Sequence, residues 1–591
     1  MTRTAGIPFL PLIVTPIASP ISRFAVHNIS GIGEEKTCSP NACMKQPADP
    51  VRIKFELAGD QIDRLQNLLT QSGQLAGPSH LETRKAVYYD TRDACLRESG
   101  YSLRQLSGNS PKLQLVTATN SAAYRYFETV RWQHNAGPQQ VVPEEISPEL
   151  LPSELALPVK HVLRPIFTVE AEQRIHALAQ GNSRIEIVIT EGIIQSSGRT
   201  ASFGEAQFWL KAGRAEDLFS LVLGIDETVP LRFSFHTEAG RGYALIESRK
   251  RKHSKRKPVK LEADMSSAAA FRIIAHQCLH QVVANEPMMC ARDAEALHQV
   301  RIGLRRLKMA LWLFAPLCTD AQIQTIKTEI RWFGELLGPA RDADAFLSEV
   351  IFPLRRRYRD DPGLISLQRT YSAQRTKLYD HISQAANSAR FRAILLDIAA
   401  WIETGRWAMN RAGEATASRN RPIGEFAEEE LTRLRKKLKK KGNDLAELPP
   451  AERHKLRLHV KKMRYTVEFF LSLFPGKKKS KRALLASLKS LQSALGGAND
   501  IAVRTGLKEE IITEKKSRAT ALKRQHRAFA AGLIIGHQQA KIEPTMKQAE
   551  RAYKDCLDTK PFWIQDEAKK SSSSSGERST TLVAPASAPA D

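Results

Sequence analysis

One motif occurs twice in the C-terminal half of the chain, and this duplication limits the fold more than any other feature. The first copy, HQVRIGLRRLK, begins at His298, and the second, HKLRLHVKKMR, begins at His454. Further along, LGPARD from Leu337 returns as LGGAND from Leu495. The first pair is offset by 156 residues and the second by 158. Two separate motifs with nearly the same offset predict a duplicated helical unit.

Each copy, placed on a helix at about 100° per residue, has its cations on one side. Val300 and Leu304 fall on a separate apolar stripe, so each helix holds a cationic ridge beside its packing face. Like charges along a helix repel by roughly tenths of a kcal/mol per pair, which a bound anion offsets. A solvated basic surface is the alternative, but the recurrence of the same residue types at the same angles favours anion binding. The ridge residues are His298, Arg301, Arg305 and Lys308 in the first copy and His454, Arg457, Lys461 and Arg464 in the second.

The charge of the whole chain agrees with a basic binding surface. Among 591 residues, 89 are Lys or Arg and 63 are Asp or Glu, giving a formal net charge of +26. Such an excess indicates a polyanionic partner. No apolar stretch of about eighteen residues occurs, so we expect no membrane-spanning helix and no membrane partner. The seven cysteines are scattered and show no paired CxxC spacing. This pattern is typical of proteins in a reducing compartment, so we expect a cytoplasmic protein.

The hydrophobic pattern changes along the chain and predicts two folded modules. From 50 to 247 it alternates with period two, as in an antiparallel sheet with a few helices that is closed or strongly curved. A basic linker follows at 248–261, where like charges repel. From 262 to 562 the period becomes 3.6, which predicts an all-α module of two repeats, at about 262–415 and 420–562.

We expect both ends of the chain to be disordered. In the extension 1–49, prolines interrupt a short apolar run, so a targeting peptide is the less favoured interpretation. Met1 and Met44 are both candidate translation starts, and Met44 is favoured because it directly precedes the first predicted strand. The tail, 563–591, is rich in Ser, Ala and Pro.

The duplicated motif, followed by L-G-x-x-x-D, resembles the CHAD domain (conserved histidine α-helical domain) over about 262–560. The resemblance implies two pseudo-symmetric four-helix bundles with a basic channel that binds inorganic polyphosphate. Lys461 and Lys462 stand where a Lys-Arg pair is more usual. The channel residues that the resemblance implies are His298, Arg301, Arg305, Arg306 and Lys308, and His454, Arg457, Lys461, Lys462 and Arg464.

Residues 51–246 resemble the CYTH domain, the triphosphate tunnel fold. The segment YYDTRD from Tyr88, the segment GYSLR from Gly100 and the strand from Glu205 to Lys211 carry the resemblance. It implies an eight-stranded antiparallel barrel in which glutamates hold a divalent metal and basic residues grip a triphosphate. With the helical module, the fold class becomes α+β multidomain: a β-barrel followed by an all-α domain of two bundles.

The sequence departs from the CYTH pattern at the positions that perform the chemistry. The opening E-x-E-x-K motif falls on Pro50, Arg52 and Lys54, which leaves only the lysine. Gln207 replaces a glutamate, and the closing S-K pair is Thr237-Glu238, which reverses the charge. We therefore expect a degenerate site that binds Mg²⁺ poorly, so that Mg²⁺ or Mn²⁺ is a cofactor only if this module is active. In that case Glu205, Glu128 and Glu186 are the catalytic candidates, and Glu205 and Glu186 the metal ligands. The triphosphate-binding candidates are Lys54, Arg104, Lys211 and Arg232.

These observations favour a polyphosphate-binding protein that needs no cofactor and has an inactive CYTH domain. We expect it in the cytoplasm, in association with polyphosphate granules. Tripolyphosphate is a second candidate ligand. One alternative is a metal-dependent inorganic triphosphatase, and another is a basic protein associated with nucleic acid. Nucleic acid is less favoured because few aromatic side chains lie on the ridges to stack with bases. Whether the chain is an enzyme stays open, with the balance against it.

Overall fold

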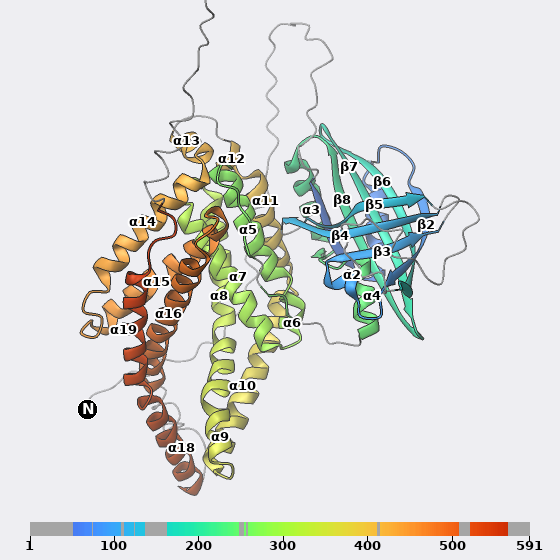
Figure 1. Ribbon diagram of the computed structural model, residues 1–591. Helices are drawn as coiled ribbons and strands as arrows, with labels where there is room; N and C mark the ends of the chain where they lie inside the picture. Colours follow the sequence, from blue (N-terminus) through green and yellow to red (C-terminus); the bar gives the residue numbers. More distant parts are fainter. Residues whose placement is uncertain are drawn as a thin grey trace, which may run out of the picture. The chain divides into compact units, whose positions relative to one another are not determined.

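The computed structural model describes residues 51–73, 75–107, 111–122, 125–135, 162–247, 253–255, 258–318, 320–409, 414–506 and 521–564. The extension 1–49, nearly all of the tail 563–591 and part of the linker 248–261 lie outside these residues, so the expectations for them stay predictions. The described segments form a β-sheet half followed by a helical half (Figure 1).

The N-terminal half is an antiparallel sheet. Within the described residues its nine strands follow the order β5-β4-β3-β2-β6-β7-β8-β1-β9 (Figure 1). The segments of period-two alternation therefore become strands. Their bounds are β1 Arg52–Leu57, β2 His80–Asp90, β3 Tyr101–Leu106, β4 Lys112–Ala122, β5 Arg125–Asn135, β6 Arg164–Gln180, β7 Ser183–Ser196, β8 Arg199–Ala212 and β9 Arg232–Phe233.

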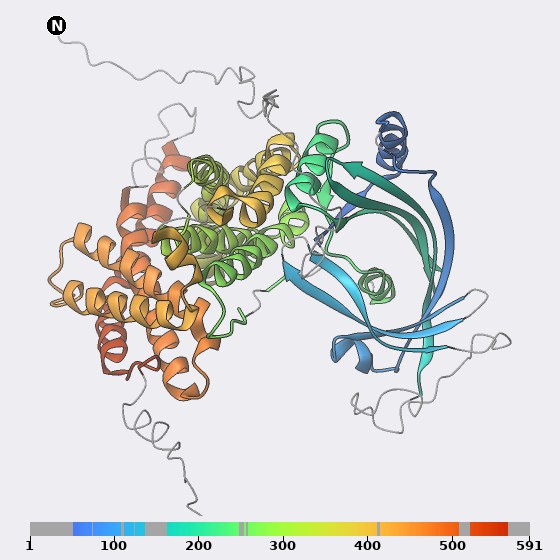
Figure 2. The same ribbon diagram turned by 90° about the horizontal axis from the view of Figure 1, so that it is seen from above.

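The predicted closed barrel is wrong. Strand β1 lies near β5, but it already pairs with β8 on one edge and with β9 on the other. Strand β9 takes up this second edge at Phe55 and Glu56, and β1 and β5 are not paired among the described strands, so the ladder of hydrogen bonds stays open. The sheet is instead strongly curved, and α4 (Glu238–Glu247) lies inside its curve (Figure 2).

Alternate residues of each long strand face opposite sides of the sheet, as the pleat requires. Ile53 and Phe55 of β1 point to the convex side, where they join a large apolar core with α1 (Gly59–Gln71) and α3 (Ala215–Thr228). Lys54 and Glu56 consequently point to the concave side. The same alternation in β8 places Glu205, Gln207, Trp209 and Lys211 on the concave side, opposite Ala206, Phe208 and Leu210.

Helix α4 packs closely on the concave side of the sheet. Tyr243 and Ala239 share an apolar cluster with Phe167 of β6 and Tyr88 of β2. Gly242 allows this approach, because a Cβ atom there would lie 2.3 Å from the Phe167 ring. The first turn of α4 is thereby held over the centre of the concave face.

The C-terminal half is helical. None of the helices in the described residues is long and apolar enough to cross a membrane. Helix α2 (Cys95–Glu98) belongs to the sheet half, and in the helical half a π-helical turn (Leu347–Ile351) and a 3₁₀ turn (Leu471–Leu473) interrupt the α-helices. The α-helices of this half are α5 Ser267–Val283, α6 Glu286–Cys290, α7 Ala294–Leu313, α8 Gln322–Phe346, α9 Phe352–Arg357, α10 Pro362–Ala386, α11 Ala389–Thr404, α12 Arg406–Met409, α13 Glu414–Asn420, α14 Ile423–Lys441, α15 Pro450–Phe470, α16 Lys478–Gly506, α18 Ala521–Gln539 and α19 Ile542–Asp558.

The helix boundaries repeat the offset seen in the sequence. Three helices of the first repeat and three of the second begin 156 residues apart. Local signals set the two motif helices: the Asp293 side chain accepts a bond from the Ala296 N–H (2.6 Å) at the start of α7, and Pro450 opens α15. The arrangement as two four-helix bundles stays a prediction. The matched starts are Ser267 and Ile423 (α5, α14), Ala294 and Pro450 (α7, α15), and Gln322 and Lys478 (α8, α16).

Candidate functional site

The two motif helices, α7 and α15, pack against each other. The Arg306 guanidinium carbon lies 5.5 Å from the ring centre of Phe469, and the Lys462 Nζ lies 4.2 Å from that of Trp312. Residue numbers fall along α15 as they rise along α7, so the helices run in opposite directions across this contact. His298 and His454, each near the start of its helix, therefore lie toward opposite ends of the pair, and the cations between them come together.

Cations of both repeats meet between the two helices. The Lys461 ammonium of α15 has its pKa lowered to about 8, first by burial and then by Arg305, Arg457 and Lys308. Arg305 and Lys308 belong to the other repeat. Arg305 also lowers the pKa of Arg301, after burial, which extends the group along α7. We call Arg301, Arg305, Lys308, Arg457 and Lys461 the interhelical cation cluster.

The L-G-x-x-x-D motifs lie beneath this cluster. The Arg301 Nη1 donates to the carbonyl oxygen of Gly334 at 3.5 Å and lies 3.5 Å from where a Cβ of Gly338 would be. In the second repeat, the Arg457 Nη2 lies 3.3 Å from the Cβ position of Gly496. In each repeat, a glycine of the L-G-x-x-x-D motif thus lies beside an arginine of the motif helix, so the two motifs that are separate in sequence meet in space.

The cluster is poorly neutralised by the protein itself. Helix α8 adds further cations, Arg331 and Arg341, near Lys308 and Arg301. Asp342 and Glu335 also lie close enough to influence the cluster, but no ion pair within 4.0 Å joins a described carboxylate to any of its five side chains. An anion from outside would supply the missing counter-charge.

The two motif histidines differ in environment. His298 is half-buried, and its Nδ1 has no hydrogen-bond partner among the described residues. Burial, followed by the nearby Arg341, lowers the pKa of His298. It therefore takes up its proton only at a lower pH than an ordinary histidine. His454 is exposed.

Three of the predicted channel residues point away from the cluster. Arg306 is buried, with 2% of its surface exposed, and donates to the Gln281 side chain at 2.9 Å. Lys462 lies over Trp312, on another side of α15. Arg464 is paired with Glu468 at 2.7 Å and donates to Gln492 at 2.8 Å. Arg464 belongs to the predicted ridge, whereas Arg306 and Lys462 were implied only by the resemblance. The sequence did not reveal their partners, because these lie on other helices or one turn further along.

Arg331 and Arg341 are the cations near the cluster that the motif copies did not include. Arg341 lies inside the LGPARD segment, so its position beside a repeated motif was an available signal. Arg331 lies on α8 outside both motifs, and no sequence signal singled it out.

The concave face of the sheet brings together several of the predicted tunnel residues, but as ion pairs with one another. The Lys54 Nζ lies 2.7 Å from Glu205 and donates to the carbonyl oxygen of His236 at 2.8 Å. Gln207 donates to the other oxygen of Glu205 at 3.0 Å. Arg241 of α4 donates to Glu56 at 3.1 Å. The buried cations here already have carboxylate partners.

Glu238, at the start of α4, is a second buried carboxylate of this face, after Glu205. It is paired with Arg84 and accepts a hydrogen bond from the Tyr88 hydroxyl at 3.0 Å, and Arg104 lies 3.9 Å away. Burial alone would raise the pKa of Glu238, but Arg84 and Arg104 outweigh it and hold the pKa below its ordinary value. A buried carboxylate thus lies among the basic side chains that the resemblance assigned to a triphosphate.

The remaining tunnel candidates are dispersed. Lys211 and Glu186 pair with each other at 2.8 Å, and Arg232 pairs with Glu286 of α6 at 3.2 Å. The side chain of Glu128 lies outside the described residues. Among the residues that are described, no group of three or more His, Cys, Asp or Glu side chains is placed to hold a metal ion.

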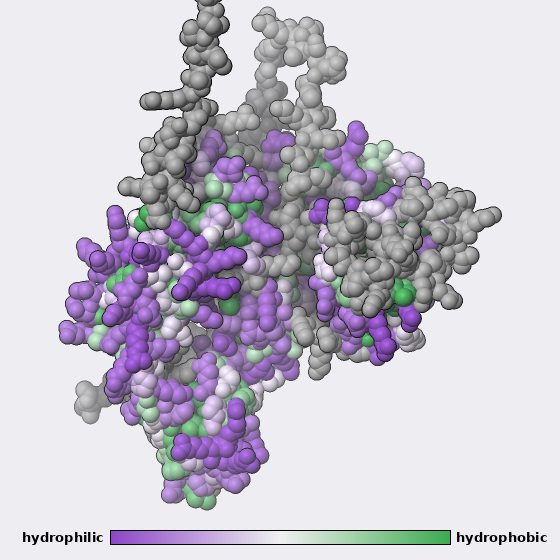
Figure 3. Space-filling model, in the orientation of Figure 1, coloured by the Kyte–Doolittle hydropathy of each residue, from purple (hydrophilic) through white to green (hydrophobic). Residues whose placement is uncertain are grey.

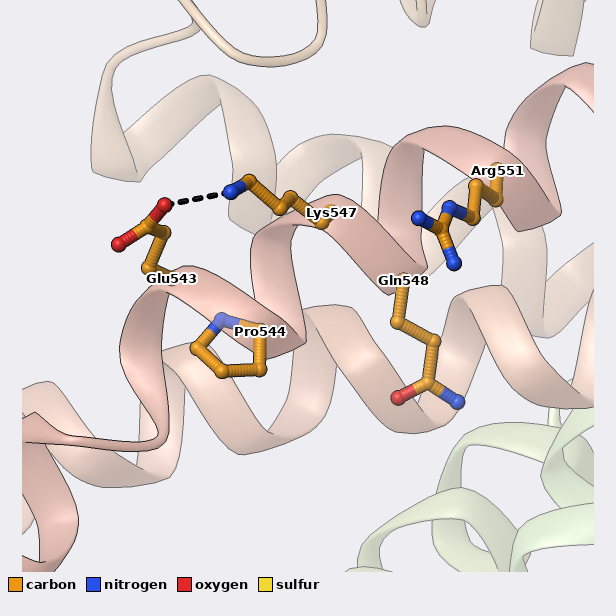
Figure 4. Close-up of a pocket in the computed structure, with 5 residues that line it drawn as sticks. All are labelled: Glu543, Pro544, Lys547, Gln548 and Arg551. Atoms are coloured by element: carbon orange, nitrogen blue, oxygen red, sulfur yellow. Dashed lines mark ion pairs between the residues drawn. The ribbon is translucent and has the colours of Figure 1, made fainter.

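A pocket of about 390 Å³ lies along α19, on exposed residues that no sequence signal indicated. Its residues follow one side of the helix (Figure 4). Lys547 is paired there with Glu543 at 2.6 Å, so the local charge is partly balanced. The lining residues are Glu543, Pro544, Lys547, Gln548 and Arg551.

Comparison with known families identifies the helical half. Residues 273–509 match the CHAD domain family, a span that contains both basic motifs and both L-G-x-x-x-D motifs. The chain therefore contains a CHAD domain. The match does not reach the sheet half, and no curated protein sequence matches the chain.

Solved structures of several proteins are similar to parts of the chain. The CHAD domain of Ricinus communis is 28% identical and covers 51% of this chain and 97% of its own, with a TM-score of 0.44. PptA from Streptomyces chartreusis is 18% identical and covers 49% and 99%, with a TM-score of 0.36. HpAC1 of Hippeastrum, which is described as having a dominant triphosphatase activity, is 15% identical and covers 34% and 96%, with a TM-score of 0.25. The CHAD assignment rests on the family match.

Proposed function

We propose, from the premise that the helical half contains a CHAD domain, that this protein binds inorganic polyphosphate at the interhelical cation cluster. The observation that carries the proposal is the position of Lys461 among Arg305, Lys308 and Arg457, with no described carboxylate paired to any of them. Bringing half-buried cations of two repeats together is unfavourable in the free protein. A polyanion between the helices offsets this repulsion.

The chemistry of the cluster suits a phosphate chain. Polyphosphate presents about one negative charge per phosphate and no bases, so recognition depends on cations that displace its counterions. Arginine offers a planar pair of donors to phosphate oxygens, and lysine offers a mobile point charge. The cluster includes both kinds, so it can hold a phosphate chain by paired donors and by point charges.

In this proposal the sheet half does not turn over triphosphate and requires neither Mg²⁺ nor Mn²⁺. The pairing of Lys54 with Glu205 and the enclosure of Glu238 between Arg84 and Arg104 support it. A triphosphate would have to displace these internal carboxylates. Glu205, a candidate metal ligand, is already engaged by a lysine and by Gln207.

Equilibrium binding of the full-length protein to fluorescently labelled long-chain polyphosphate, measured across a salt series, tests the proposal. We expect tight binding whose affinity falls steeply with salt, because several phosphate contacts release counterions. Unlabelled polyphosphate should compete far better than RNA of equal charge concentration, and tripolyphosphate should compete weakly. Absence of binding at low salt contradicts the proposal, and equal competition by RNA favours a nucleic-acid-associated protein instead.

The triphosphatase alternative has its own test. Rapid release of phosphate from tripolyphosphate with Mg²⁺ or Mn²⁺, abolished by a chelator and by Glu205→Gln, would assign catalysis to the sheet half. We expect no such turnover.

We further propose that the protein lies in the cytoplasm, at polyphosphate deposits. Co-localisation of a tagged full-length chain with stained polyphosphate granules tests this, and a uniform distribution counts against it.

A further inference from the structure

Helices α14 and α15 of the second repeat carry a second group of cations outside the interhelical cation cluster. Three lie on α14 at four-residue steps, which places them along one side of that helix. Two lie on α15, which packs against α14. We call these five residues the α14–α15 patch: Arg433, Lys437, Lys441, His459 and Lys462.

The patch is held together by contacts as well as by sequence spacing. The Lys462 Nζ and the Arg433 guanidinium carbon lie 4.2 Å and 5.9 Å from the ring centre of Trp312. One indole therefore supports a cation from each helix. Lys437 and Lys441 are exposed, and Figure 3 shows hydrophilic side chains over α14. The group thus borders solvent along α14.

His459 lies at the centre of this charge. It is half-buried, and its Nδ1 has no hydrogen-bond partner among the described residues. Burial lowers the pKa of His459, and Lys441, Lys462, Lys437 and Arg433 lower it further. The histidine thus takes up its proton only at a lower pH than an ordinary histidine, and four cations lie close enough to influence it.

Counter-charge in the patch is incomplete. Glu430 is paired with Arg433 one turn along α14, and Glu429 lies nearby. No described carboxylate is paired with Lys437, Lys441 or Lys462. Three lysines on two packed helices are therefore left for an external anion.

The first repeat shows that the fold does not require these charges. At the positions 156 residues earlier, Lys437 and Lys441 correspond to Gln281 and Asn285, and His459 corresponds to Gly303. There the face is packed: Arg306, equivalent to Lys462, donates to Gln281, and a Cβ on Gly303 would lie 2.9 Å from Val282. The first repeat packs this face, with only Arg306 kept as a buried cation, while the second repeat presents lysines there to solvent.

The patch adjoins the interhelical cation cluster. Lys462 follows Lys461 in sequence and contributes to the lowered pKa of its ammonium. A polyanion on the cluster can thus continue onto the patch around α15 without crossing a neutral gap. We propose that the α14–α15 patch is a second binding segment for inorganic polyphosphate, which engages chains long enough to extend beyond Lys461. This inference rests on the proposed function of the cluster.

A pair of matched double variants tests the inference in the full-length protein. Lys437→Ala/Lys441→Ala removes two charges from the patch, and Lys436→Ala/Lys439→Ala removes two from the same helix. On a helix, positions 436 and 439 lie roughly 100–160° away from 437 and 441. Both control lysines are exposed. The two variants therefore have the same net charge and differ in where the charge is lost.

For the patch variant we expect the affinity for labelled long-chain polyphosphate to fall about tenfold. The affinity should also depend less on salt: the slope of log affinity against log salt concentration should become shallower by about 0.7 for each lost contact. Its affinity for tripolyphosphate, which is too short to reach both sites, should stay unchanged. The control variant should change neither affinity by more than about twofold, an effect of the field alone. Unchanged melting temperatures and circular dichroism confirm that all proteins are folded.

Each other outcome overturns the inference in a recognisable way. Equal losses in both variants mean diffuse electrostatics, and no loss in either means that the patch is unused. A parallel loss of tripolyphosphate binding places the patch within the first site, and a loss confined to RNA binding makes it a nucleic-acid surface. If the unmodified protein binds no polyphosphate at all, the proposed function fails together with the patch. If the unmodified protein binds polyphosphate but the patch variant behaves like the control, only the inference about the patch fails.

Discussion

The concave face of the sheet and the contact between α7 and α15 both gather basic side chains, but they balance the charge differently. In the sheet, Lys54 is paired with Glu205, and Arg84 with Glu238. Between the helices, Lys461 lies among other cations and has no paired carboxylate within the described residues. A basic surface offers binding free energy to an anion only where the protein has not already supplied the counter-charge. The same residue types therefore predict a binding site in one half and an internally satisfied face in the other.

The largest effect is expected from charge reversal in the interhelical cation cluster of the helical half. Replacing both Arg301 and Arg457 by Glu reverses charge in each repeat, so we expect the affinity for long-chain polyphosphate to fall on the order of 10³-fold at low salt, as phosphate contacts are lost and repulsion is introduced. Fluorescence anisotropy with labelled polyphosphate measures it. Reversal of the same number of exposed charges at Lys478 and Lys479 is the control and should cost far less. Similar losses in both proteins would show that no defined cluster exists.

The next effect concerns the sheet. Glu238→Gln leaves Arg84 and Arg104 without their buried counter-charge, and we expect it to destabilise the sheet half by about 3 kcal/mol in urea unfolding. Because the pKa of Glu238 is lowered, the stability that its charge provides is present above the ordinary carboxyl pKa and is lost as the pH falls through the lowered value. Added tripolyphosphate should stabilise the variant more than the parent protein.

Two further variants test whether this effect is specific to the buried charge of Glu238. Glu247→Gln removes a more exposed partner of Arg97 from the same helix and should cost less than about 1 kcal/mol. Removing both charges, in Arg84→Gln/Glu238→Gln, should recover part of the lost stability. If Glu238→Gln unfolds at the same urea concentration as the parent protein, the ion pair does not stabilise the face.

An intermediate effect is expected from pH. The Lys461 pKa of about 8 lies below its ordinary value of 10.5 because burial and neighbouring cations disfavour its charge, and a bound anion raises it again. Binding should therefore take up a proton near pH 8, and the affinity should fall by up to about tenfold between pH 7 and pH 9. The free protein should show the opposite trend: we expect its stability to rise as the pH increases from about 8 toward 10.5.

Calorimetry in buffers of different ionisation enthalpy measures the proton uptake. Lys461→Arg keeps the charge over this range, so it should bind with little pH dependence and no uptake near pH 8. Proton uptake that persists in this variant would assign the titration to another group.

The smallest expected effect separates stability from binding. Gly496→Ala should stabilise α16 by up to about 1 kcal/mol through helix propensity, yet its Cβ would crowd Arg457 and reduce the affinity a few-fold. Gly224→Ala in α3 is the control, because no atom lies within 4 Å of its Cβ position, and it should leave the affinity unchanged. Thermal melts and the anisotropy assay measure the two effects. A Gly496 variant that binds normally would mean that Arg457 has room elsewhere.

Periodicity and repetition predicted the elements well, because both are local properties of the chain. The period-two segments became strands, and the offset of 156 reappeared in the helix starts. Closure of the sheet was predicted wrongly, since it depends on β9, a two-residue strand with no sequence pattern of its own, occupying the edge of β1. Boundaries of domains and the roles of single site residues remain predictions.

The sequence by itself determined the duplicated motif and the angular position of its cations on a helix, since both follow from residue type and spacing. Only the tertiary structure decided which cations have partners. Arg306 and Arg464 share their helices with Arg301 and Arg457, yet Gln281 in one case and Glu468 and Gln492 in the other take them out of the cluster. The charge on a side chain is fixed by its chemistry, whereas its availability to a ligand depends on the neighbours that folding brings to it.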